Sequence, residues 1–353
     1  MKIDITRNVL LSDDIKAYLS AVLDALEYDK LFVLTDEITN KLCLPLVKDM
    51  PCMKEAYHIV IGATDTHKTL ETLASVWKQL GDMGGTRHSL MVNLGGGMVT
   101  DLGGFAASTF KRGIKYLNIP TTLLSMVDAS VGGKTGINFN GLKNEIGVFK
   151  APEKVILDTV FLKTLDKENI LSGYAEMLKH GLISNMENYN ELLDFDLTNV
   201  DYEHLGKMVA TSVAIKEKVV EEDPFEKGIR KALNLGHTAG HAFESWALTR
   251  HPYLHGYAVA WGLVCELYLS NKKVGFPADV MEKTVKFIIS NYGKLPIGET
   301  DYSELYEYMT HDKKNTAGII NFTLMGGVGD IRINQSANKE EIFDMLEYYT
   351  MKC

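Results

Sequence analysis

The feature that most constrains the fold is the alternation of β-rich runs with amphipathic segments in the first 150 residues. Short apolar runs read LFVLT (31–35), YHIVI (57–61) and SLMVNL (89–94), and a helical pattern, KTLETLASVWKQL, occupies residues 68–80. Continuous apolar runs of this length are typical of parallel strands that are buried on both faces. We therefore predict an α/β domain with a Rossmann-like parallel sheet in this part of the chain.

After EKVILD (153–158) the strand pattern fades and long helical patterns replace it, such as those at residues 205–222 and 280–292. The one later strand candidate is IINFTLM (319–325). A chain of 353 residues also exceeds the usual size of a single hydrophobic core. The sequence predicts two domains, a parallel-sheet domain at 1–150 and a mainly helical domain at 151–353.

The composition of the chain limits the classes of partner that we expect and the cell compartment in which it works. The formal net charge of −9 disfavours a nucleic-acid or anionic-membrane partner. The four cysteines form no CxxC pair, and the segment MKIDITRNVLLSDD has acids where a secretion signal needs an apolar core. The most apolar helical stretch, YAVAWGLVC, meets Glu266 too early to span a membrane. We expect a cytoplasmic enzyme or binding protein.

The segment LNLGHTAGHAF (233–243) places His237 and His241 four residues apart. At helical spacing the two imidazoles share one face and could bind one metal ion, or they could be a packed structural pair. A zinc peptidase needs a glutamate directly after the first histidine, and Thr238 stands there. Spacing alone excludes the peptidase pattern and leaves the other two interpretations open.

Two glycine-rich segments are candidates for anion binding. NLGGGMVTDLGGFAA (93–107) follows an apolar run, so its backbone amides could approach a pyrophosphate at a helix start, although a tight structural turn fits equally and the GxGxxG spacing is absent. Asp36, at the end of the run 31–35, is placed like a ribose-binding acid.

The second glycine-rich segment, ASVGGKTGINFNGLKNEIG (129–147), ends like a Walker A motif. Asp128 stands where that motif needs its first glycine, so we reject an ATPase. What remains is a glycine-rich loop with Lys134, Lys143 and Asn144, which suits a phosphate or carboxylate unless the lysines are simply solvated.

Residues 172–182 carry Glu176 and Lys179 three residues apart on an otherwise apolar helix, either as a solvated ion pair or as a buried polar pair. His255 begins a further apolar helical pattern. Together with His237, Glu176 and His255 could form a site of two histidines and one carboxylate, which leaves metal positions open for substrate.

Taken in order, these motifs resemble those of the 3-dehydroquinate synthases. The resemblance runs through GGGMVTDLGGFAASTFKRG, PTTLLSMVDASVGGKTGIN, KNEIGVFKAPEKVILD, LSGYAEMLKHGL, LNLGHTAGHAFE, LHGYAVAWG and HDKKNTAGIINFTL, and covers nearly the whole chain beyond residue 60. It implies an N-terminal NAD domain, a C-terminal domain with Zn²⁺ or Co²⁺, and a homodimer in which Arg112 reaches the neighbouring active site.

The resemblance also implies roles for individual residues. The implied metal ligands are Glu176, His237 and His255. The implied catalytic residues are His241, Lys179, Asn234 and Lys216. The implied substrate-binding residues are Arg112, Asp128, Lys134, Asn144, Lys216, Arg230, Asn234 and Lys313, with Lys314 as the alternative to Lys313. The expected NAD-binding residues are Asp36 from its position, and from the resemblance Lys68, Gly97, Met98, Val99, Thr100, Asp101, Thr121, Thr122, Lys134, Lys143, Phe161, Leu162, Lys163 and Thr164.

The implied reaction belongs to the shikimate pathway of aromatic amino acid biosynthesis. It converts 3-deoxy-D-arabino-heptulosonate 7-phosphate into 3-dehydroquinate and phosphate by transient oxidation with NAD, phosphate elimination, re-reduction, ring opening and aldol cyclisation. Three places depart from the family pattern. In ATDTHK (63–68), the residues before the expected NAD lysine, Lys68, are not the frequent Asp-Gly-Glu. Tyr257 stands where glutamate is common, and Ala239 stands where phenylalanine is frequent.

Three alternatives remain open at this point. Other sugar-phosphate cyclases share NAD and metal but act on substrates without a carboxylate, and Arg230 and Asn234 count against them. Metal-dependent alcohol or glycerol dehydrogenases would consume NAD stoichiometrically, and the lysine-rich loop counts against those. A binding protein without catalysis would have to keep the whole set of polar residues for no chemistry.

Overall fold

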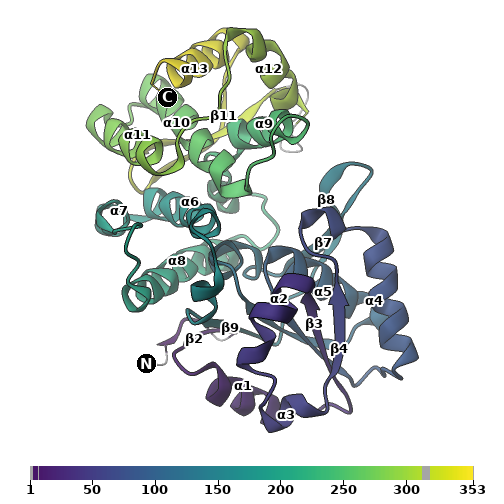
Figure 1. Ribbon diagram of the computed structural model, residues 1–353. Coiled ribbons are helices and arrows are strands. Elements are labelled where there is room, and N and C mark those ends of the chain that lie inside the picture. The colour runs from purple at the N-terminus through teal and green to yellow at the C-terminus, as the bar shows by residue number, and fades with distance from the viewer. Residues whose placement is uncertain (1–2, 7, 312–318, 353) are drawn as a thin grey trace. The chain divides into compact units, whose positions relative to one another are not determined.

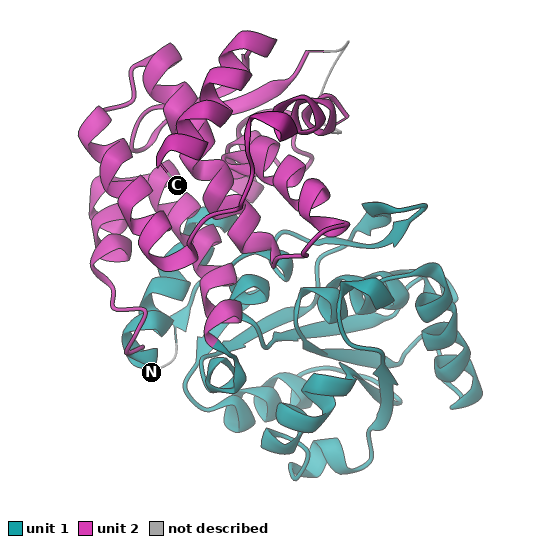
Figure 2. Cartoon of the chain, turned by 45° about the horizontal axis from the view of Figure 1, so that its top comes forward, with its two compact units in different colours: residues 1–166, 201–217 teal, residues 167–200, 218–353 magenta. Residues whose placement is uncertain are grey.

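The computed structural model describes residues 3–6, 8–311 and 319–352, and the chain divides into two compact units (Figure 2). Unit 1 comprises Met1–Asp166 and Asp201–Glu217, and unit 2 comprises Lys167–Val200 and Lys218–Cys353. The strand at residues 154–158 belongs to the main sheet of unit 1, although it follows the boundary expected at residue 150. The units therefore divide later, after Asp166.

A seven-stranded sheet with the order β1-β2-β9-β6-β5-β3-β4 forms the centre of unit 1 (Figure 1). Its strands are β1 (Ile3–Asp4), β2 (Val9–Ser12), β3 (Leu31–Asp36), β4 (Tyr57–Ile61), β5 (Leu90–Gly95), β6 (Lys115–Pro120) and β9 (Lys154–Asp158). All neighbouring strands are parallel except β1 and β2. The predicted strands at 31–35, 57–61 and 89–94 are β3, β4 and β5, and the predicted α/β fold class is confirmed.

Helices α4 (Leu70–Asp82) and α5 (Gly97–Thr109) pack on this sheet and enclose a core that includes Leu73, Val76 and Leu80. The remaining helical elements of this unit are α1 (Ile15–Asp24), η1 (Leu44–Leu46), α2 (Glu37–Leu42), α3 (Pro51–Lys54), η2 (Asp65–His67), η3 (Phe110–Arg112), η4 (Ser125–Ala129) and η5 (Phe161–Thr164). The helical pattern predicted at 68–80 becomes α4, which begins at Leu70 because the Thr69 hydroxyl accepts the Thr72 N–H.

The second glycine-rich segment is not a loop. It forms the antiparallel hairpin of β7 (Lys134–Phe139) and β8 (Leu142–Phe149). Residues of β8 are exposed along its whole length, so the strand has no apolar alternation for a sequence pattern to detect. β7 lies against α5, where a Cβ on Gly104 would meet Thr135 Cγ2 at 2.5 Å.

Helices make up most of unit 2. They are α6 (Lys167–Ser184), α7 (Met186–Asp194), η6 (Ile229–Asn234), α9 (His237–Leu248), α10 (His255–Val274), α11 (Ala278–Tyr292), η7 (Glu299–Asp301), α12 (Tyr302–Thr310) and α13 (Lys339–Lys352), beside the hairpin of β10 (Asn321–Gly327) and β11 (Asp330–Ser336). The long α8 (Tyr202–Glu222) belongs mostly to unit 1. The helical patterns at 205–222 and 280–292 and the later strand are confirmed as α8, α11 and β10. Across the described residues, no helix has the length and apolarity that crossing a membrane requires.

Glycines bring three helices of unit 2 into backbone contact. A Cβ on Gly262 in α10 would lie 2.0 Å from the Gly236 carbonyl oxygen at the start of α9. A Cβ on Gly256, also in α10, would lie 1.9 Å from the Ser172 carbonyl oxygen in α6. Because a side chain at either position would collide with backbone, these glycines fix how closely α6, α9 and α10 approach.

Candidate active site

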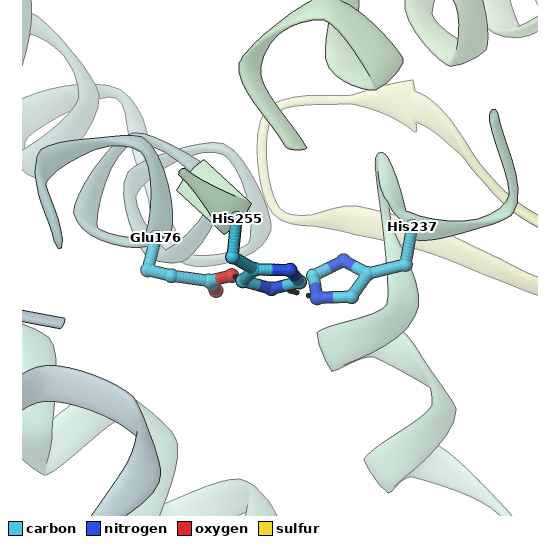
Figure 3. Close-up of side chains that lie close together, drawn as sticks. All are labelled: Glu176, His237 and His255. Atoms are coloured by element: carbon cyan, nitrogen blue, oxygen red, sulfur yellow. Dashed lines mark ion pairs between the residues drawn. The ribbon is translucent and has the colours of Figure 1, made fainter. Parts of the chain in front are cut away.

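Three side chains from these three helices converge on one point in unit 2 (Figure 3). Glu176 comes from the middle of α6, while His237 and His255 are the first residues of α9 and α10. Glu176 Oε1 lies 3.4 Å from His237 Nε2 and 3.5 Å from His255 Nε2. Each of the three residues offers one ligand atom within 4.8 Å of the other two. The arrangement matches the site of two histidines and one carboxylate that the sequence predicts.

The second nitrogen of each imidazole already has an acceptor. His237 Nδ1 lies 3.1 Å from the Leu235 carbonyl oxygen, and His255 Nδ1 lies 3.4 Å from Glu244 Oε2. A proton on Nδ1 leaves the lone pair on Nε2, which is the nitrogen that faces Glu176. Metal-binding histidines commonly carry such an outer partner, which fixes the ring and raises its basicity.

Glu176 is fully buried and keeps one oxygen for a ligand. Its Oε2 accepts a hydrogen bond from Lys179 Nζ, whereas Oε1 accepts none from any residue that the structure describes. Burial raises the pKa of Glu176, but the positive charge of Lys179 and the neighbouring His237 hold it well below its usual range. An ionised, buried oxygen that faces two imidazole nitrogens fits a divalent cation.

The two imidazoles differ in their electrostatic surroundings. Burial and the charge of Lys179 lower the pKa of His237 to about 4, so its ring is neutral, as a metal ligand must be. Burial lowers the pKa of His255 as well, but the carboxylates of Glu244 and Glu176 outweigh it and raise that pKa to about 10. Without a metal ion these carboxylates therefore keep the His255 ring protonated at neutral pH, and a cation bound at Nε2 would replace that proton.

His241 lies beside this group without joining it. Its ring centroid is 5.3 Å from that of His237 and 6.1 Å from that of His255. Among residues 3–6, 8–311 and 319–352, the group of close ligand atoms that contains His237 and His255 does not include His241. Of the two histidines that spacing left equivalent, one faces the cation position and the other borders it.

Sequence reasoning missed Glu244. It follows His241 by three residues and His237 by seven, so all three share one face of α9. A carboxylate at that spacing behind a pair of candidate histidines was the available signal. Lys179 was left as either a solvated or a buried partner of Glu176, and its side chain is buried.

Arg230 and Asn234 lie in η6, directly before α9. Arg230 is buried and donates from Nη1 to the Pro224 carbonyl oxygen at 2.6 Å, and Asn234 Nδ2 donates to Glu226 Oε1 at 2.8 Å. Asn234 borders a cavity of about 370 Å³ whose other lining residues are Glu226, Lys231, Asn321, Phe322, Thr323 and Asn334. Glu226 was not a sequence candidate, because it lies in a charged run that reads as a solvated surface.

In unit 1, the residues predicted to bind NAD gather at the carboxyl edge of the sheet. Asp36 ends β3, Gly97 follows β5, Thr121 follows β6 and Phe161 follows β9. The chain leaves β3 toward β4 on one side and leaves β5 toward β6 on the other, so a topological switch point lies between β3 and β5. Ligands of open α/β sheets bind at such points.

The start of α5 is bare backbone. Its N-cap, Gly96, makes no side-chain cap bond. A Cβ on Gly96 would lie 3.1 Å from Thr122 Cγ2, and one on Gly97 would lie 3.1 Å from the Ala129 side chain. A helix start without a side-chain cap suits an anionic ligand such as the pyrophosphate of a dinucleotide. Asp36 instead caps α2 by accepting the Ile38 and Thr39 N–H groups, so a ribose contact there stays a prediction.

The buried Lys68 side chain stands at the centre of a polar cluster in unit 1, between the partly buried Asp101 and the exposed Asn144. Its Nζ donates to Asp101 Oδ2 and to Asn144 Oδ1, each at 2.5 Å. Burial raises the pKa of Asp101 despite the attraction of Lys68. The cluster links the start of α4, the first turns of α5 and the β7–β8 hairpin, which carry three of the predicted NAD or substrate positions.

We predict that Lys68→Met destabilises unit 1 by about 2 kcal/mol, because it leaves the largely buried Asp101 carboxylate without its cation; the residual exposure of Asp101 keeps the loss below that of a fully buried pair. The same change is expected to weaken NADH binding at least tenfold, measured by the fluorescence of bound NADH. Lys78→Met is the matched control, since Lys78 pairs with Asp82 on the exposed face of α4. It should change stability by no more than about 0.5 kcal/mol and leave NADH affinity intact. Equal effects in both variants would contradict the assignment.

The remaining predicted residues are more dispersed. Lys216 Nζ donates to the backbone oxygen and to Oδ1 of Asp128, at 2.5 and 2.6 Å. Lys134 begins β7 and is exposed, as is Lys143 in β8. Arg112 lies in η3 with a left-handed φ of 71°. Lys313 and Lys314 lie outside the described residues.

Comparison with known proteins shows the family of this chain. Residues 58–172 match the N-terminal family model of 3-dehydroquinate synthase and residues 173–315 match the C-terminal one. A 3-dehydroquinate synthase of Parabacteroides distasonis is 56% identical over 344 residues, which cover 97% of this chain and 98% of that protein. One from Streptococcus pyogenes is 36% identical over 90% of this chain and 89% of its own length.

Solved structures establish the fold independently. A 2-epi-5-epi-valiolone synthase from Streptomyces hygroscopicus, solved with NAD⁺ and Zn²⁺, has a TM-score of 0.87 at 24% identity and covers 99% of this chain and 98% of its own. A 2-deoxy-scyllo-inosose synthase, solved with carbaglucose-6-phosphate, NAD⁺ and Co²⁺, has a TM-score of 0.86 at 21% identity and covers 98% of both chains. With both family models matched and relatives aligned along nearly its whole length, this chain belongs to the 3-dehydroquinate synthase family.

Proposed function

We propose that this chain converts 3-deoxy-D-arabino-heptulosonate 7-phosphate into 3-dehydroquinate and phosphate, as a cytoplasmic enzyme of the shikimate pathway. The observation that carries the proposal is the convergence of Glu176, His237 and His255 around a buried carboxylate oxygen that accepts no hydrogen bond within the described residues. The identity of 56% to a 3-dehydroquinate synthase over nearly the full length supports the substrate assignment.

Glu176, His237 and His255 would hold a divalent ion, Zn²⁺ or Co²⁺. When bound, such an ion polarises the substrate oxygen that it contacts. Lys179 keeps Glu176 ionised, and Glu244 and the Leu235 carbonyl oxygen keep the two imidazoles turned toward it. These neighbours therefore prepare the three ligands before any ion or substrate arrives.

The carboxyl edge of the unit 1 sheet would hold NAD, with the first amides of α5 at the pyrophosphate and Lys68 beside Asp101. When bound, NAD supplies a reversible acceptor of hydride. The bare glycines at 96 and 97 are what allows a phosphate to reach the backbone N–H groups. In this proposal unit 1, which contains the seven-stranded sheet, is the NAD domain and unit 2 is the metal domain, so the division falls after Asp166 and not at the expected residue 150.

Side chains of the chain itself would hold the substrate anions and move protons. Arg230 is a buried guanidinium and suits the carboxylate, because it can donate two parallel hydrogen bonds. Lys216, which Asp128 holds in place, would bind a second oxygen of the substrate. His241 borders the ligand group with its own imidazole, so it can accept or donate a proton there.

Arg230 is the residue proposed to bind the substrate carboxylate, which the substrates of the other sugar-phosphate cyclases lack. We expect Arg230→Met to lower kcat/KM for the heptulosonate phosphate about 10- to 100-fold, the loss typical of a charge-assisted hydrogen bond. Arg332→Met is the matched control, since Arg332 pairs with Asp330 on an exposed strand. The wild type should release phosphate from the heptulosonate phosphate and not from a hexose 6-phosphate, in a coupled phosphate assay. The reverse preference would favour another cyclase.

The proposal includes a homodimer in which Arg112 acts at the neighbouring active site. Apolar side chains line the exposed β7–β8 hairpin, which supports a covered surface there. They are Phe139, Leu142, Ile146, Val148 and Phe149.

A mixing experiment tests the role of Arg112 across the dimer. Arg112→Ala and His255→Ala are each expected to be inactive, but mixed and re-equilibrated subunits should recover about a quarter of the wild-type activity, because half of the dimers then hold one complete site. No recovery, with mixed dimers demonstrated by sedimentation, would place Arg112 at its own active site.

A further inference from the structure

One charged side chain lies where the helical pattern of α10 is otherwise apolar. Glu266 is fully buried in the middle of that helix, between Cys265 and Leu267, which are also fully buried. A carboxylate without solvent is costly unless hydrogen bonds satisfy it. The sequence showed Glu266 only as the residue that interrupts an apolar run, and gave it no role.

Both carboxylate oxygens of Glu266 accept backbone N–H groups at the start of α9. Oε2 accepts from Gly236 at 2.7 Å, and Oε1 accepts from Thr238 at 2.9 Å and Ala239 at 3.1 Å. These three amides flank His237, the first residue of α9 and one of the proposed metal ligands. The N-cap residue, Gly236, makes no side-chain cap bond of its own, so Glu266 takes over that function from another helix.

The same three bonds tie together the helices that carry the two proposed histidine ligands. Glu266 lies on α10, which begins at His255, and its partners lie on α9, which begins at His237. The backbone contact between Gly262 and Gly236 lies beside these bonds and sets the distance between the two helices. A shift of Glu266 would therefore move one imidazole relative to the other.

Charge matters at this place as well as geometry. The N-terminal end of a helix carries a partial positive charge, which opposes a cation held at the first residue of the helix. His237 is that residue in α9. The negative charge of the Glu266 carboxylate, bonded to the first amides of α9, offsets this positive potential. A neutral side chain of the same shape would offset it less.

We propose that Glu266 is a positioning residue that joins the two histidine-bearing helices and whose negative charge makes the start of α9 acceptable to a divalent cation. The inference rests on the metal site of the proposed function and extends it to a residue that does not touch the ion. It concerns affinity for the ion and not the chemical step, so it can be tested without substrate.

The test measures Zn²⁺ and Co²⁺ affinity of the full-length protein by competition with a chromogenic chelator. Glu266→Gln keeps the shape and removes the charge, and we expect its dissociation constant for Zn²⁺ to rise about 10- to 100-fold, the range for partners behind metal ligands. Glu266→Asp keeps the charge on a shorter side chain and should fall between Glu266→Gln and the wild type. The visible absorption of bound Co²⁺ should keep the same band positions in Glu266→Asp, because the three ligands are unchanged.

Glu341→Gln is the matched control. Glu341 Oε2 accepts the Asn338 N–H at 2.8 Å at the start of α13, so it is also a glutamate that accepts a backbone N–H at a helix start. We expect this variant to bind Zn²⁺ as the wild type does. Equal weakening in Glu341→Gln and Glu266→Gln would overturn the proposal, since it would show a general effect of helix capping. Wild-type affinity in a folded Glu266→Gln would overturn it directly.

Hydrogen exchange in the wild-type protein keeps the proposal testable if Glu266→Gln does not fold. The amides of Gly236, Thr238 and Ala239 should be protected in the metal-free protein, because Glu266 and not the ion holds them. Rapid exchange of these amides until metal is added would overturn the proposal. Absence of metal binding by the wild type is a different result, which would contradict the metal site of the proposed function itself.

Discussion

Replacing His255 by alanine is expected to empty the metal site and to lower kcat/KM by about 10³-fold or more. The change removes one of the three proposed ligands and leaves Glu176 and His237 as the remaining pair. A bound ion supplies several kcal/mol of transition-state stabilisation, and all of that is lost with it. Metal content is measured by elemental analysis after gel filtration, and turnover by phosphate release.

His241→Ala is the matched variant, because it removes an imidazole one helical turn from His237 without removing a ligand. We expect it to retain its metal and to lose about 10²- to 10⁴-fold in kcat, as for loss of a group that transfers protons. Circular dichroism checks that both variants are folded. An empty site in His241→Ala, or a full one in His255→Ala, would reverse the ligand assignment.

Replacing Gly262 by alanine is expected to destabilise unit 2 by about 3 kcal/mol and to lower its melting temperature by roughly 10 °C. The new Cβ would lie 2.0 Å from the Gly236 carbonyl oxygen and 2.7 Å from the Gly240 nitrogen. Neither atom can move aside, because both belong to the backbone of the helix start that carries His237. Metal affinity should fall as well, since α9 must separate from α10.

The matched control for this prediction is Gly298→Ala. Gly298 has an extended backbone with φ of −139°, and an added Cβ would meet nothing within 4 Å. We expect Gly298→Ala to change the free energy of unfolding by no more than about 0.5 kcal/mol, as a surface substitution does, so that its melting temperature stays close to that of the wild type. Calorimetry of the metal-free proteins measures both. If Gly262→Ala has the same melting temperature as the wild type, the close approach of α9 and α10 does not determine the geometry of the site.

At Tyr257, one of the positions where the sequence departs from the expected family pattern, aromatic rings pack around the side chain. Tyr257, which stands where glutamate is common, has its ring centroid 5.3 Å from that of Tyr292 and 5.9 Å from that of Trp261, both in edge-to-face contact. Such pairs stabilise through the complementary charges of ring face and edge. Ala239, the smaller residue at a position where phenylalanine is frequent, is fully buried at the start of α9.

Much of the fold could be predicted because its central strands, β3 and β5, are buried along their whole length, and because the edge strand β4 keeps an apolar run although three of its five residues are exposed. Continuous apolar runs identified β3, β4 and β5, and helical periodicity identified α8 and α11. The β7–β8 hairpin could not be predicted in this way, since the residues of β8 are exposed and carry no alternation. The change of pattern near residue 150 precedes β9, so it could not show that this strand joins the first sheet.

The site could be predicted only in part, because side chains far apart in the sequence meet through helix packing. Residue type and the family resemblance together proposed Glu176, His237 and His255, and the structure brings them within reach of one ion. Glu244 and Glu266 were missed, since each acts on another residue and not on the ion; of the two, only Glu244 left a signal in the sequence, its helical spacing behind the two histidines. Their roles depend on which backbone or ring nitrogen they face, which only the packing of α9 against α10 determines.

The most direct test of the account counts phosphate and NADH in the same cuvette. The metal-loaded protein receives the heptulosonate phosphate with NAD at a concentration far below that of the substrate. If NAD is a cofactor that is oxidised and reduced within each turnover, many phosphates are released per NAD and no NADH remains in solution. A dehydrogenase would accumulate NADH in step with substrate loss and stop when NAD is exhausted. That result, or no phosphate release at all, would contradict the proposed reaction.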